Sequence, residues 1–253
     1  MLFENTSISV RCGLVSNAVF WIASLLGLFA DYMSAEKKSP LLARCKLQPQ
    51  RHLSRRERTD LILLTSFNML VMVFAVCCPL YEYAWERAYA APGGRSTRLT
   101  DRSARIWHDE LLLKIPLHVL LTEAWFYLVH RALHASPFLY RHVHRVHHRF
   151  AAPTAMSCVY VHPIDFVLGN IAPIWAGPIL TNAHPATCCY LWFPLAMLGT
   201  CVGHCGYRIA GDADRHHDDH HLFFDWNFGG MYLSDYLLGT AREYRAEGEK
   251  KTV

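Results

Sequence analysis

Three short clusters of histidine are the residues of this sequence best suited to chemistry. Neutral imidazole is the commonest side-chain ligand for metals such as iron, zinc, copper and nickel. Residues three and four positions apart share one face of an α-helix, so each cluster predicts imidazoles placed side by side. Eight histidines exceed one tetrahedral zinc site and suffice for two metal ions. The clusters are His130 and His134; His144, His147 and His148; and His217, His220 and His221.

Other kinds of metal protein fit these clusters poorly. A zinc protease needs a His-Glu-x-x-His motif, which the sequence lacks. A soluble di-iron carboxylate protein needs Glu-x-x-His motifs, and none fits the clusters. A metal transporter would carry its histidines within the spanning helices, whereas these lie beside the apolar segments. The pattern favours a membrane-surface di-iron centre that activates O₂, and a catalytically silent metal-binding scaffold stays open.

Long apolar segments separate the histidine clusters. Hydrophobic residues make up 52% of the 253 residues and charged residues 18%, against about a quarter charged in an average soluble chain. Four apolar blocks, at residues 12–30, 61–83, 111–129 and 164–203, are long enough to cross a bilayer. In the second block, Pro79 predicts a kink or an end. Prolines interrupt the fourth block, which predicts a helical hairpin with its tip near residues 182–185.

The predicted fold is therefore all-α: an integral membrane protein with about four transmembrane helices and a cytosolic, helical, histidine-rich cap for two metals. The basic loop at 31–60 is cytosolic by the positive-inside rule. An even number of crossings separates this loop from each histidine cluster, which places them on the same side. Ser54 and Glu57 predict a capping box at the start of the second spanning helix. We expect three regions: N-terminal helices and basic loop (1–110), a catalytic domain (111–241) and a charged cytosolic tail (242–253).

Charge and cysteine content exclude two further classes. The net charge of +4 is weak, and the basic residues are not interleaved with aromatic residues, so nucleic acid is not an expected partner. The nine cysteines contain no Cys-x-x-Cys motif and lie mostly in apolar runs. We expect buried, reduced thiols rather than a disulfide framework.

The residues around the clusters add a specific pattern. The sequence reads WFYLVHRALH at 125–134, HRVHH at 144–148, HPID at 162–165, HCGY at 204–207, HHDDHH at 216–221 and DYLLGT at 235–240. With this order and these flanks, residues 110–241 resemble the fatty acid hydroxylase superfamily of membrane di-iron enzymes. That superfamily includes C-4 methylsterol oxidases, C-5 sterol desaturases and cholesterol 25-hydroxylase.

The resemblance implies a set of metal ligands. The eight clustered histidines map onto the family's ligands, and His204 of the HCGY element is implied as a ninth. The HPID element matches the family's His-Pro-x-Glu, except that Asp165 replaces glutamate and shortens the carboxylate's reach. His162 is then either a ligand or a supporting group, and Asp165 orients a ligand imidazole. His216 and Asp218 are expected as additional or supporting groups. His52, His108, His118 and His184 are expected not to be ligands.

The resemblance also implies an activity: an O₂-dependent monooxygenase with two non-heme iron ions, fed with electrons from NAD(P)H through cytochrome b5 or its reductase. The expected substrate is a sterol or another membrane lipid, and the expected enzyme is most like a C-4 methylsterol oxidase or cholesterol 25-hydroxylase. A C-5 sterol desaturase, a fatty acyl or alkyl-chain hydroxylase, and an inactive scaffold remain as alternatives.

Three further expectations concern surroundings and location. Arg141, Arg145 and Arg149 offer a basic surface for acidic cytochrome b5 or for lipid headgroups. Lys250 and Lys251 resemble a dilysine retrieval signal, which predicts a multi-pass protein of the endoplasmic reticulum membrane with a cytosolic active site and C-terminus. Aromatic residues are candidates to line a sterol cavity, namely Trp107, Trp125, Trp175, Trp192 and Phe193.

Overall fold

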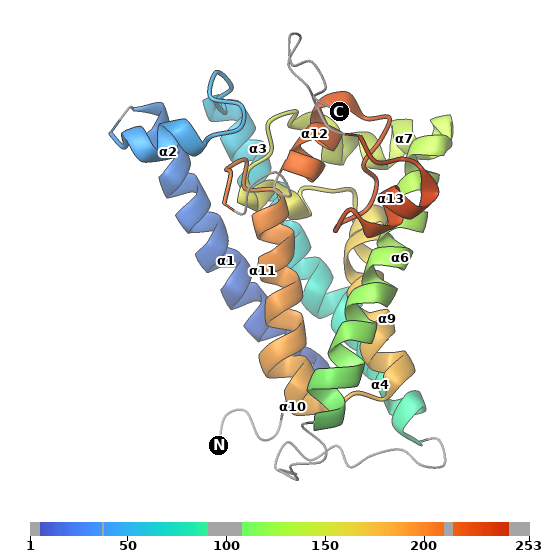
Figure 1. Cartoon of the computed structure of the whole chain (residues 1–253). Helices are drawn as coiled ribbons and strands as arrows, with labels where there is room; N and C mark the ends of the chain where they lie inside the picture. Colours follow the sequence, from blue (N-terminus) through green and yellow to red (C-terminus); the bar gives the residue numbers. More distant parts are fainter. Residues whose placement is uncertain (1–5, 37, 91–107, 210–214, 243–253) are drawn as a thin grey trace.

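Apolar helices dominate the computed structural model, which describes residues 6–36, 38–90, 108–209 and 215–242 (Figure 1). Five helical segments are long and apolar enough to cross a membrane: Ile8–Ala35, Arg55–Ala88, Glu110–Ala135, Pro163–Thr181 and Pro185–Gly203. No β-strand forms among the described residues, where one isolated bridge pairs Lys46 with Tyr207. The predicted all-α membrane fold is thereby confirmed.

The first spanning segment is a single helix, and each of the other four is assembled from consecutive helices that include a π-helical stretch. The first segment is α1 (Ile8–Ala35). The second joins α3 (Arg55–Ser66), η1 (Phe67–Cys77) and α4 (Cys78–Ala90), and the third joins η2 (Glu110–Lys114) and α6 (Ile115–Ala135). The fourth joins α8 (Pro163–Asp165), η5 (Phe166–Ile171) and α9 (Ala172–Thr181). The fifth joins α10 (Pro185–Thr187), η6 (Cys188–Trp192) and α11 (Phe193–Gly203).

Prolines and one left-handed residue explain how these segments are divided. The apolar block 164–203 is the predicted hairpin: α9 ends at Thr181, Asn182 adopts a left-handed conformation (φ 50°), and α10 begins at Pro185. The four predicted blocks therefore contain five segments that are long and apolar enough to span a membrane. Pro79 does not end the second one: η1 runs directly into α4, and the π-helical turns before Pro79 are the kind of local adjustment that accommodates a missing N–H.

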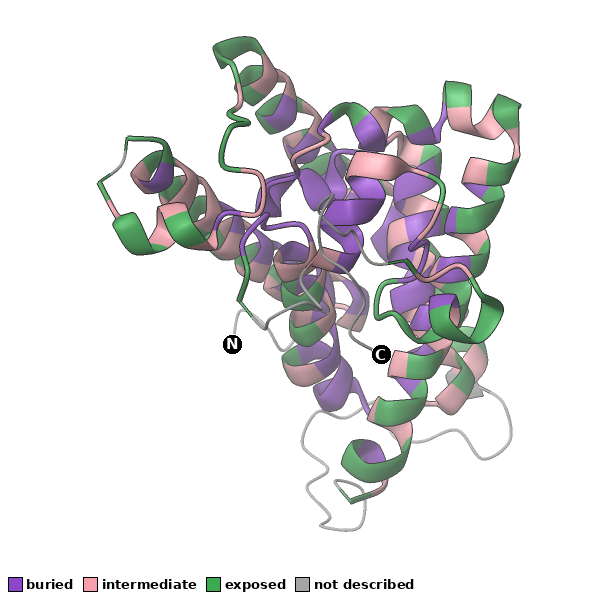
Figure 2. Cartoon of the chain, turned by 45° about the horizontal axis from the view of Figure 1, so that its top comes forward, coloured by how far each residue is buried: buried purple, intermediate pink, exposed green. Residues whose placement is uncertain are grey.

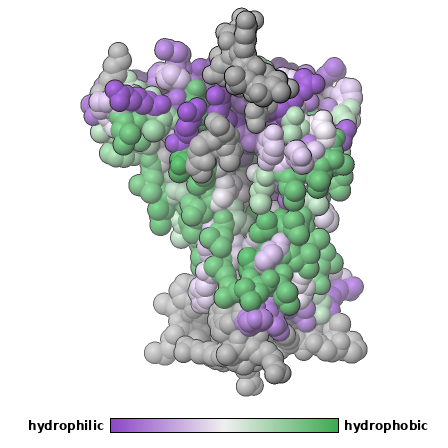
Figure 3. Space-filling view, viewed as in Figure 1, coloured by the Kyte–Doolittle hydropathy of each residue, from purple (hydrophilic) through white to green (hydrophobic). Residues whose placement is uncertain are grey.

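The short helices gather at one end of the bundle, together with the basic loop. These are α2 (Pro40–Cys45), α7 (Pro137–His142), η3 (His144–Arg149), η4 (Ala155–Val159), α12 (Arg215–Phe223) and α13 (Leu233–Leu238). Figure 1 places α2, α7, α12 and α13 at the top, and Figure 3 shows hydrophilic residues there above a largely hydrophobic body. The predicted capping box of Ser54 and Glu57 opens α3 at this same end.

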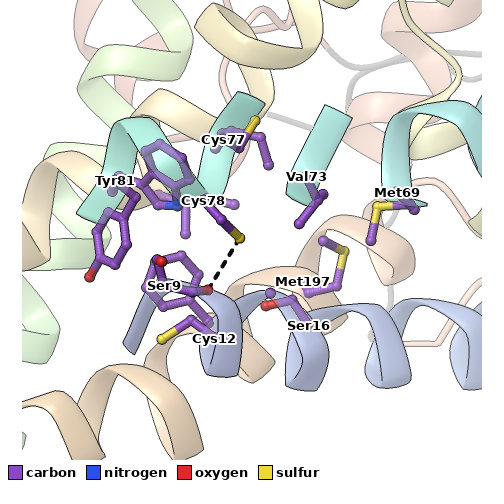
Figure 4. A pocket seen from close by; sticks show the side chains of 14 residues that line it. Ser9, Cys12, Ser16, Met69, Val73, Cys77, Cys78, Tyr81 and Met197 are labelled. Carbon is purple, nitrogen blue, oxygen red and sulfur yellow. Dashed lines mark hydrogen bonds between the residues drawn. The ribbon is translucent and has the colours of Figure 1, made fainter. Parts of the chain in front are cut away.

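Close helix contacts hold the spanning part together. Helix α1 packs along α11 and η4, and α6 packs along α9. The α6–α9 contact depends on Gly177, because a Cβ there would lie 2.8 Å from the Cα of His118. Between α1 and the second segment, a cavity of about 30 Å³ remains beside Ser9 and Cys78, whose thiol donates to the Ser9 carbonyl at 3.4 Å (Figure 4). This gap is water-sized and too small for a lipid.

The cysteines agree with the expectation of reduced thiols. All nine lie in the described ranges, none forms a disulfide, and all are buried except for the half-buried Cys45. The polar end of the bundle has a buried interior of its own, as Figure 2 shows. Its buried residues include histidines of all three sequence clusters.

Candidate metal centre

Nine histidines from four segments converge inside the polar end of the bundle. His130 and His134 lie near the end of α6, and His204 caps the end of α11. The other six come from η3 and α12, where the expected spacing holds on α12 but η3 is a 3₁₀-helix rather than an α-helix. They are His144, His147 and His148 on η3, and His217, His220 and His221 on α12.

The nine imidazoles form two groups. In each group, one ring nitrogen from every histidine lies within 4.8 Å of the others. Both η3 and α12 contribute to both groups, so the two groups adjoin. The first consists of His130, His134, His144, His148 and His220, and the second of His147, His204, His217 and His221.

Distances within the groups match the spacing of ligands around a metal ion. The Nε2 atom of His148 lies 2.9 Å from that of His134, 3.1 Å from that of His144 and 3.2 Å from that of His220. One proton on His148 cannot serve three neighbouring nitrogens, so hydrogen bonding does not explain this convergence. Ligands about 2.1 Å from one ion lie roughly 3.0–3.4 Å apart in octahedral or tetrahedral geometry.

The second group has the same spacing. The Nε2 atom of His204 lies 2.9 Å from that of His217 and 3.4 Å from that of His147. The Nε2 atom of His221 is buried and, within the described ranges, has no hydrogen-bond partner; the same is true of Nε2 of His130 in the first group. Buried polar nitrogens without partners are costly, and a bound metal would satisfy them. The donor set therefore fits a two-metal centre.

Acceptors behind the imidazoles fix which nitrogen carries the proton. The Nδ1 atom of His130 lies 2.6 Å from the carbonyl oxygen of Phe228, and that of His220 lies 2.6 Å from the carbonyl oxygen of Trp226. Because a carbonyl oxygen can only accept, Nδ1 must be the N–H donor in each case. Each Nε2 is thereby left with its lone pair directed into the group, as metal binding requires.

A carboxylate does the same for His144. Its Nδ1 donates to Oδ2 of Asp165 at 2.7 Å, and both side chains are only 3% exposed. Asp165 is thus the acceptor behind one imidazole of the first group. His204 is oriented by the carbonyl oxygen of Thr200, one turn earlier on α11, at 2.9 Å.

Burial keeps the cap histidines neutral. Desolvation holds the pKa of His147, His148, His217, His220 and His221 well below the usual value, and neighbouring imidazoles lower it further. Burial alone lowers the pKa of His204 to about 4. At neutral pH these rings are unprotonated, which is the form that binds metal.

Two buried carboxylates hold in place the segment that follows α12, which supplies the carbonyl oxygens behind His130 and His220. Glu123 of α6 accepts the backbone N–H groups of Gly230, Met231 and Ser234 at 2.9–3.0 Å. Asp235 accepts those of Phe228 and Gly229, the Thr240 hydroxyl, and Nε2 of His216 at 3.1 Å. The sequence pattern assigns a role to neither carboxylate. Carboxylates that accept several N–H groups hold a loop firmly.

The basic loop is also part of this framework. The backbone of residues 45–47 pairs with residues 206–208 beyond His204, and Lys46 forms an ion pair with Asp31. Gln48 donates to the carbonyl oxygen of Ala151 at 2.7 Å and to Oδ2 of Asp218 at 2.9 Å. The loop thus connects the segments that carry His148, His204 and His217.

The remaining predicted site residues lie outside the two groups. His162 is half-buried and caps α8 by accepting the backbone N–H of Ile164. His216 contacts Asp235, and the partner of Asp218 is Gln48 rather than an imidazole. The four expected non-ligands also lie outside both groups: His52, His108, His118 and His184.

A larger cavity adjoins the histidines from the membrane side. Its volume is about 320 Å³, within the range of small-molecule sites. Its lining is mostly apolar and reaches His130, His144, His147, His204 and His217. Of the aromatic candidates, Trp192 lines this cavity, Trp175 and Phe193 line the small one, and Trp125 is 42% exposed. Trp107 lies outside the described residues.

Comparison with known proteins now identifies the family. The sequence profile named "Fatty acid hydroxylase" matches residues 115–240, which carry all nine histidines. The chain belongs to the fatty acid hydroxylase superfamily, and its histidine cluster is a metal-binding cluster of a membrane protein. No solved structure was found to match the chain.

Curated relatives come from several branches of this superfamily. Fatty acid hydroxylase domain-containing protein 2 of Homo sapiens is 35% identical over 130 residues, covering 51% of this chain and 38% of that protein. Fatty acid hydroxylase ahd1 of Mycosarcoma maydis is 32% identical over 223 residues (88% and 55%). Methylsterol monooxygenase 2-2 of Arabidopsis thaliana is 34% identical over 149 residues (54% and 55%). The matched part of the chain thus spans 38–55% of the length of these relatives.

Proposed function

We propose that this protein is an O₂-dependent, non-heme di-iron monooxygenase that oxidises a sterol, most like a C-4 methylsterol oxidase or cholesterol 25-hydroxylase. The observation that carries the proposal is the junction of two histidine groups with an apolar cavity among spanning helices. Similarity to a methylsterol monooxygenase supports the sterol assignment. In this proposal residues 111–241 form the catalytic unit, and residues 1–110 supply packing helices and the basic loop.

The proposed ligands are the nine converging histidines, with five for one iron and four for the other. Iron bound there supplies the activation of O₂ and the oxidation of an unactivated C–H bond. The protein's own part is to keep the imidazoles neutral and oriented, to exclude water and to present one carbon. Asp165 orients His144, while His216 and Asp218 support the ligand segments through Asp235 and Gln48.

Electrons are proposed to come from NAD(P)H through cytochrome b5 or its reductase. Arg141 and Arg145 are exposed at the polar end, beside the histidine segments, and offer a basic surface to an acidic donor. Arg149 is less available, because it pairs with Asp60 at 2.6 Å. We assign the protein to the endoplasmic reticulum membrane with the centre on the cytosolic side. The signal that motivates this assignment, Lys250 and Lys251, lies outside the described residues.

A ligand substitution tests the proposal. His147→Ala removes one imidazole of the second group, so we expect loss of activity and less iron per chain by elemental analysis. His52→Ala is the control, because His52 is exposed and outside both groups, and it should change neither quantity. Full activity of His147→Ala would refute the ligand assignment. Absence of both bound iron and an O₂-dependent product in the unaltered protein would instead favour an inactive scaffold.

A second candidate is hydroxylation of a fatty acyl or alkyl chain. It is favoured by the similarity to fatty acid hydroxylase ahd1, which extends over 88% of this chain. Desaturation of a sterol at C-5 would use the same histidines and a differently placed carbon. Lipid profiles of cells with and without the protein separate these activities, because the accumulating precursor identifies the carbon that is oxidised.

A further inference from the structure

The larger cavity is bounded on two sides by the spanning helices α6 and α11. Both helices line it, yet α6 packs against α9 and α11 packs against α1. Leu195 and Gly199 of α11 line the cavity and are also exposed, and the facing lining residues of α6, such as Val119 and Phe126, are half-buried. Because Leu195 and Gly199 line the cavity, are exposed and belong to a spanning segment, the cavity opens toward the lipid beside them.

Two glycines widen this opening on the α11 side. A Cβ added at Gly199 or Gly203 would meet no other described residue within 4 Å. The glycines are four residues apart, on the same helix face as Ala196 and Thr200, and all four line the cavity. By contrast, a Cβ at Gly177 would collide with α6. Close packing therefore does not explain the absence of side chains at Gly199 and Gly203.

The glycine side of the cavity adjoins the candidate metal centre. Gly203 immediately precedes His204, and the cavity also reaches His130 and His144 of the other group. His130 is only 2% exposed, and its Nε2 has no partner in the part of the chain that is described. A molecule that enters beside the glycines is thus led to the unsatisfied side of the centre.

We propose that Gly199 and Gly203 determine substrate specificity by setting the width of a lateral portal that admits a ring-bearing lipid. The inference rests on the proposed sterol oxidation and names the two residues that select the substrate. A straight acyl chain is one methylene wide and needs no recess in the wall. Two missing side chains leave a recess over about 6 Å along the helix, which suits a flat, rigid ring system whose remainder stays in the bilayer.

The test uses the full-length protein in membranes supplied with its electron donors. Gly199→Ala, Gly199→Val and Gly199→Leu form a graded series, and Leu198→Ala is the control, because Leu198 is exposed on the same helix without lining the cavity. We expect kcat/KM for a 4-methylsterol to fall with side-chain size, by about tenfold or more for leucine. Turnover of a palmitoyl lipid, bound iron and Tm should change little. Leu198→Ala should match the unaltered protein.

A photoreactive sterol gives a second readout that does not need turnover. It should label the unaltered protein on α6 or α11, and Gly199→Leu should lose most of this labelling while it keeps its iron. If the unaltered protein oxidises neither lipid, the proposed function fails, and labelling still decides the portal. If Gly199→Leu oxidises and binds the sterol like the unaltered protein, the portal is refuted. An equal loss for sterol and acyl lipid would refute selection by width.

Discussion

Replacing Asp165 with asparagine tests whether orientation of one imidazole governs metal binding. His144 donates to Asp165 at 2.7 Å, and both groups are shielded from water. Asparagine keeps the size but loses the charge, which roughly halves the strength of the hydrogen bond. Its amide nitrogen can also face Nδ1, which would move the imidazole proton to Nε2, the atom directed at the metal.

The expected loss can be estimated from similar partners of metal-bound histidine. Removing such a group typically lowers metal affinity or activity about 10- to 100-fold, which corresponds to roughly 1.4–2.8 kcal/mol. Since His144 belongs to the first histidine group, the loss should fall on that group. The second group, which includes His204, should keep its metal.

The assay measures iron per chain during titration with a chelator. Asp165→Asn should release about half of the bound iron at chelator concentrations that leave the unaltered protein loaded. Asp218→Asn is the matched control, because Asp218 is 4% exposed but bonds to Gln48 instead of an imidazole. If Asp165→Asn resists the chelator as well as the unaltered protein does, or if both variants lose iron alike, the reasoning is wrong.

Two further predictions concern the effect of pH on stability and the loop that Glu123 holds. The folded-state pKa of His204, about 4, lies below its usual 6.5. Between pH 4 and 6.5 the His204 imidazole is protonated in the unfolded chain but neutral in the folded one. As pH falls from 6.5 to 4, this group should therefore lower the free energy of unfolding of the metal-free protein by about 3 kcal/mol. Thermal unfolding against pH checks this, and a flat profile would contradict it. Glu123→Ala leaves the N–H groups of Gly230, Met231 and Ser234 without their carboxylate, which should cost on the order of 3 kcal/mol. It should lower Tm and speed amide exchange at these positions. Unchanged exchange would show that the Glu123 carboxylate does not stabilise this loop.

The sequence predicted the metal cluster well because imidazoles at helical spacing are themselves the signal. His130 and His134 needed only the i, i+4 rule, and the apolar blocks needed only length and hydropathy. His204 is different: a lone histidine after an apolar run carries no spacing signal, and only the family resemblance singled it out. The division of the nine histidines into two groups follows from three-dimensional packing.

The supporting groups were much harder to predict. Phe228 and Trp226 act through backbone carbonyls, which every residue possesses, so side-chain type could not reveal them. Glu123 is a carboxylate in an apolar helix, but its partners are more than 100 residues away. Asp235 lay in a recognisable flank without a visible role. The 3₁₀ form of η3 was not predicted because the spacing of His144 and His148 is that of one face of an α-helix.

The pairing of residues 45–47 with residues 206–208 has a consequence for how the protein is made. Two of the spanning segments precede the region matched by the family profile, and the loop between them connects segments around the histidines. A gene fragment encoding only residues 115–240 would lack that brace and the long face of α11 covered by α1. During synthesis, the carbonyls that orient His130 and His220 emerge only after all nine histidines. The complete, oriented centre therefore cannot bind metal before that point, and grafting it into a new scaffold would require transplanting most of the chain.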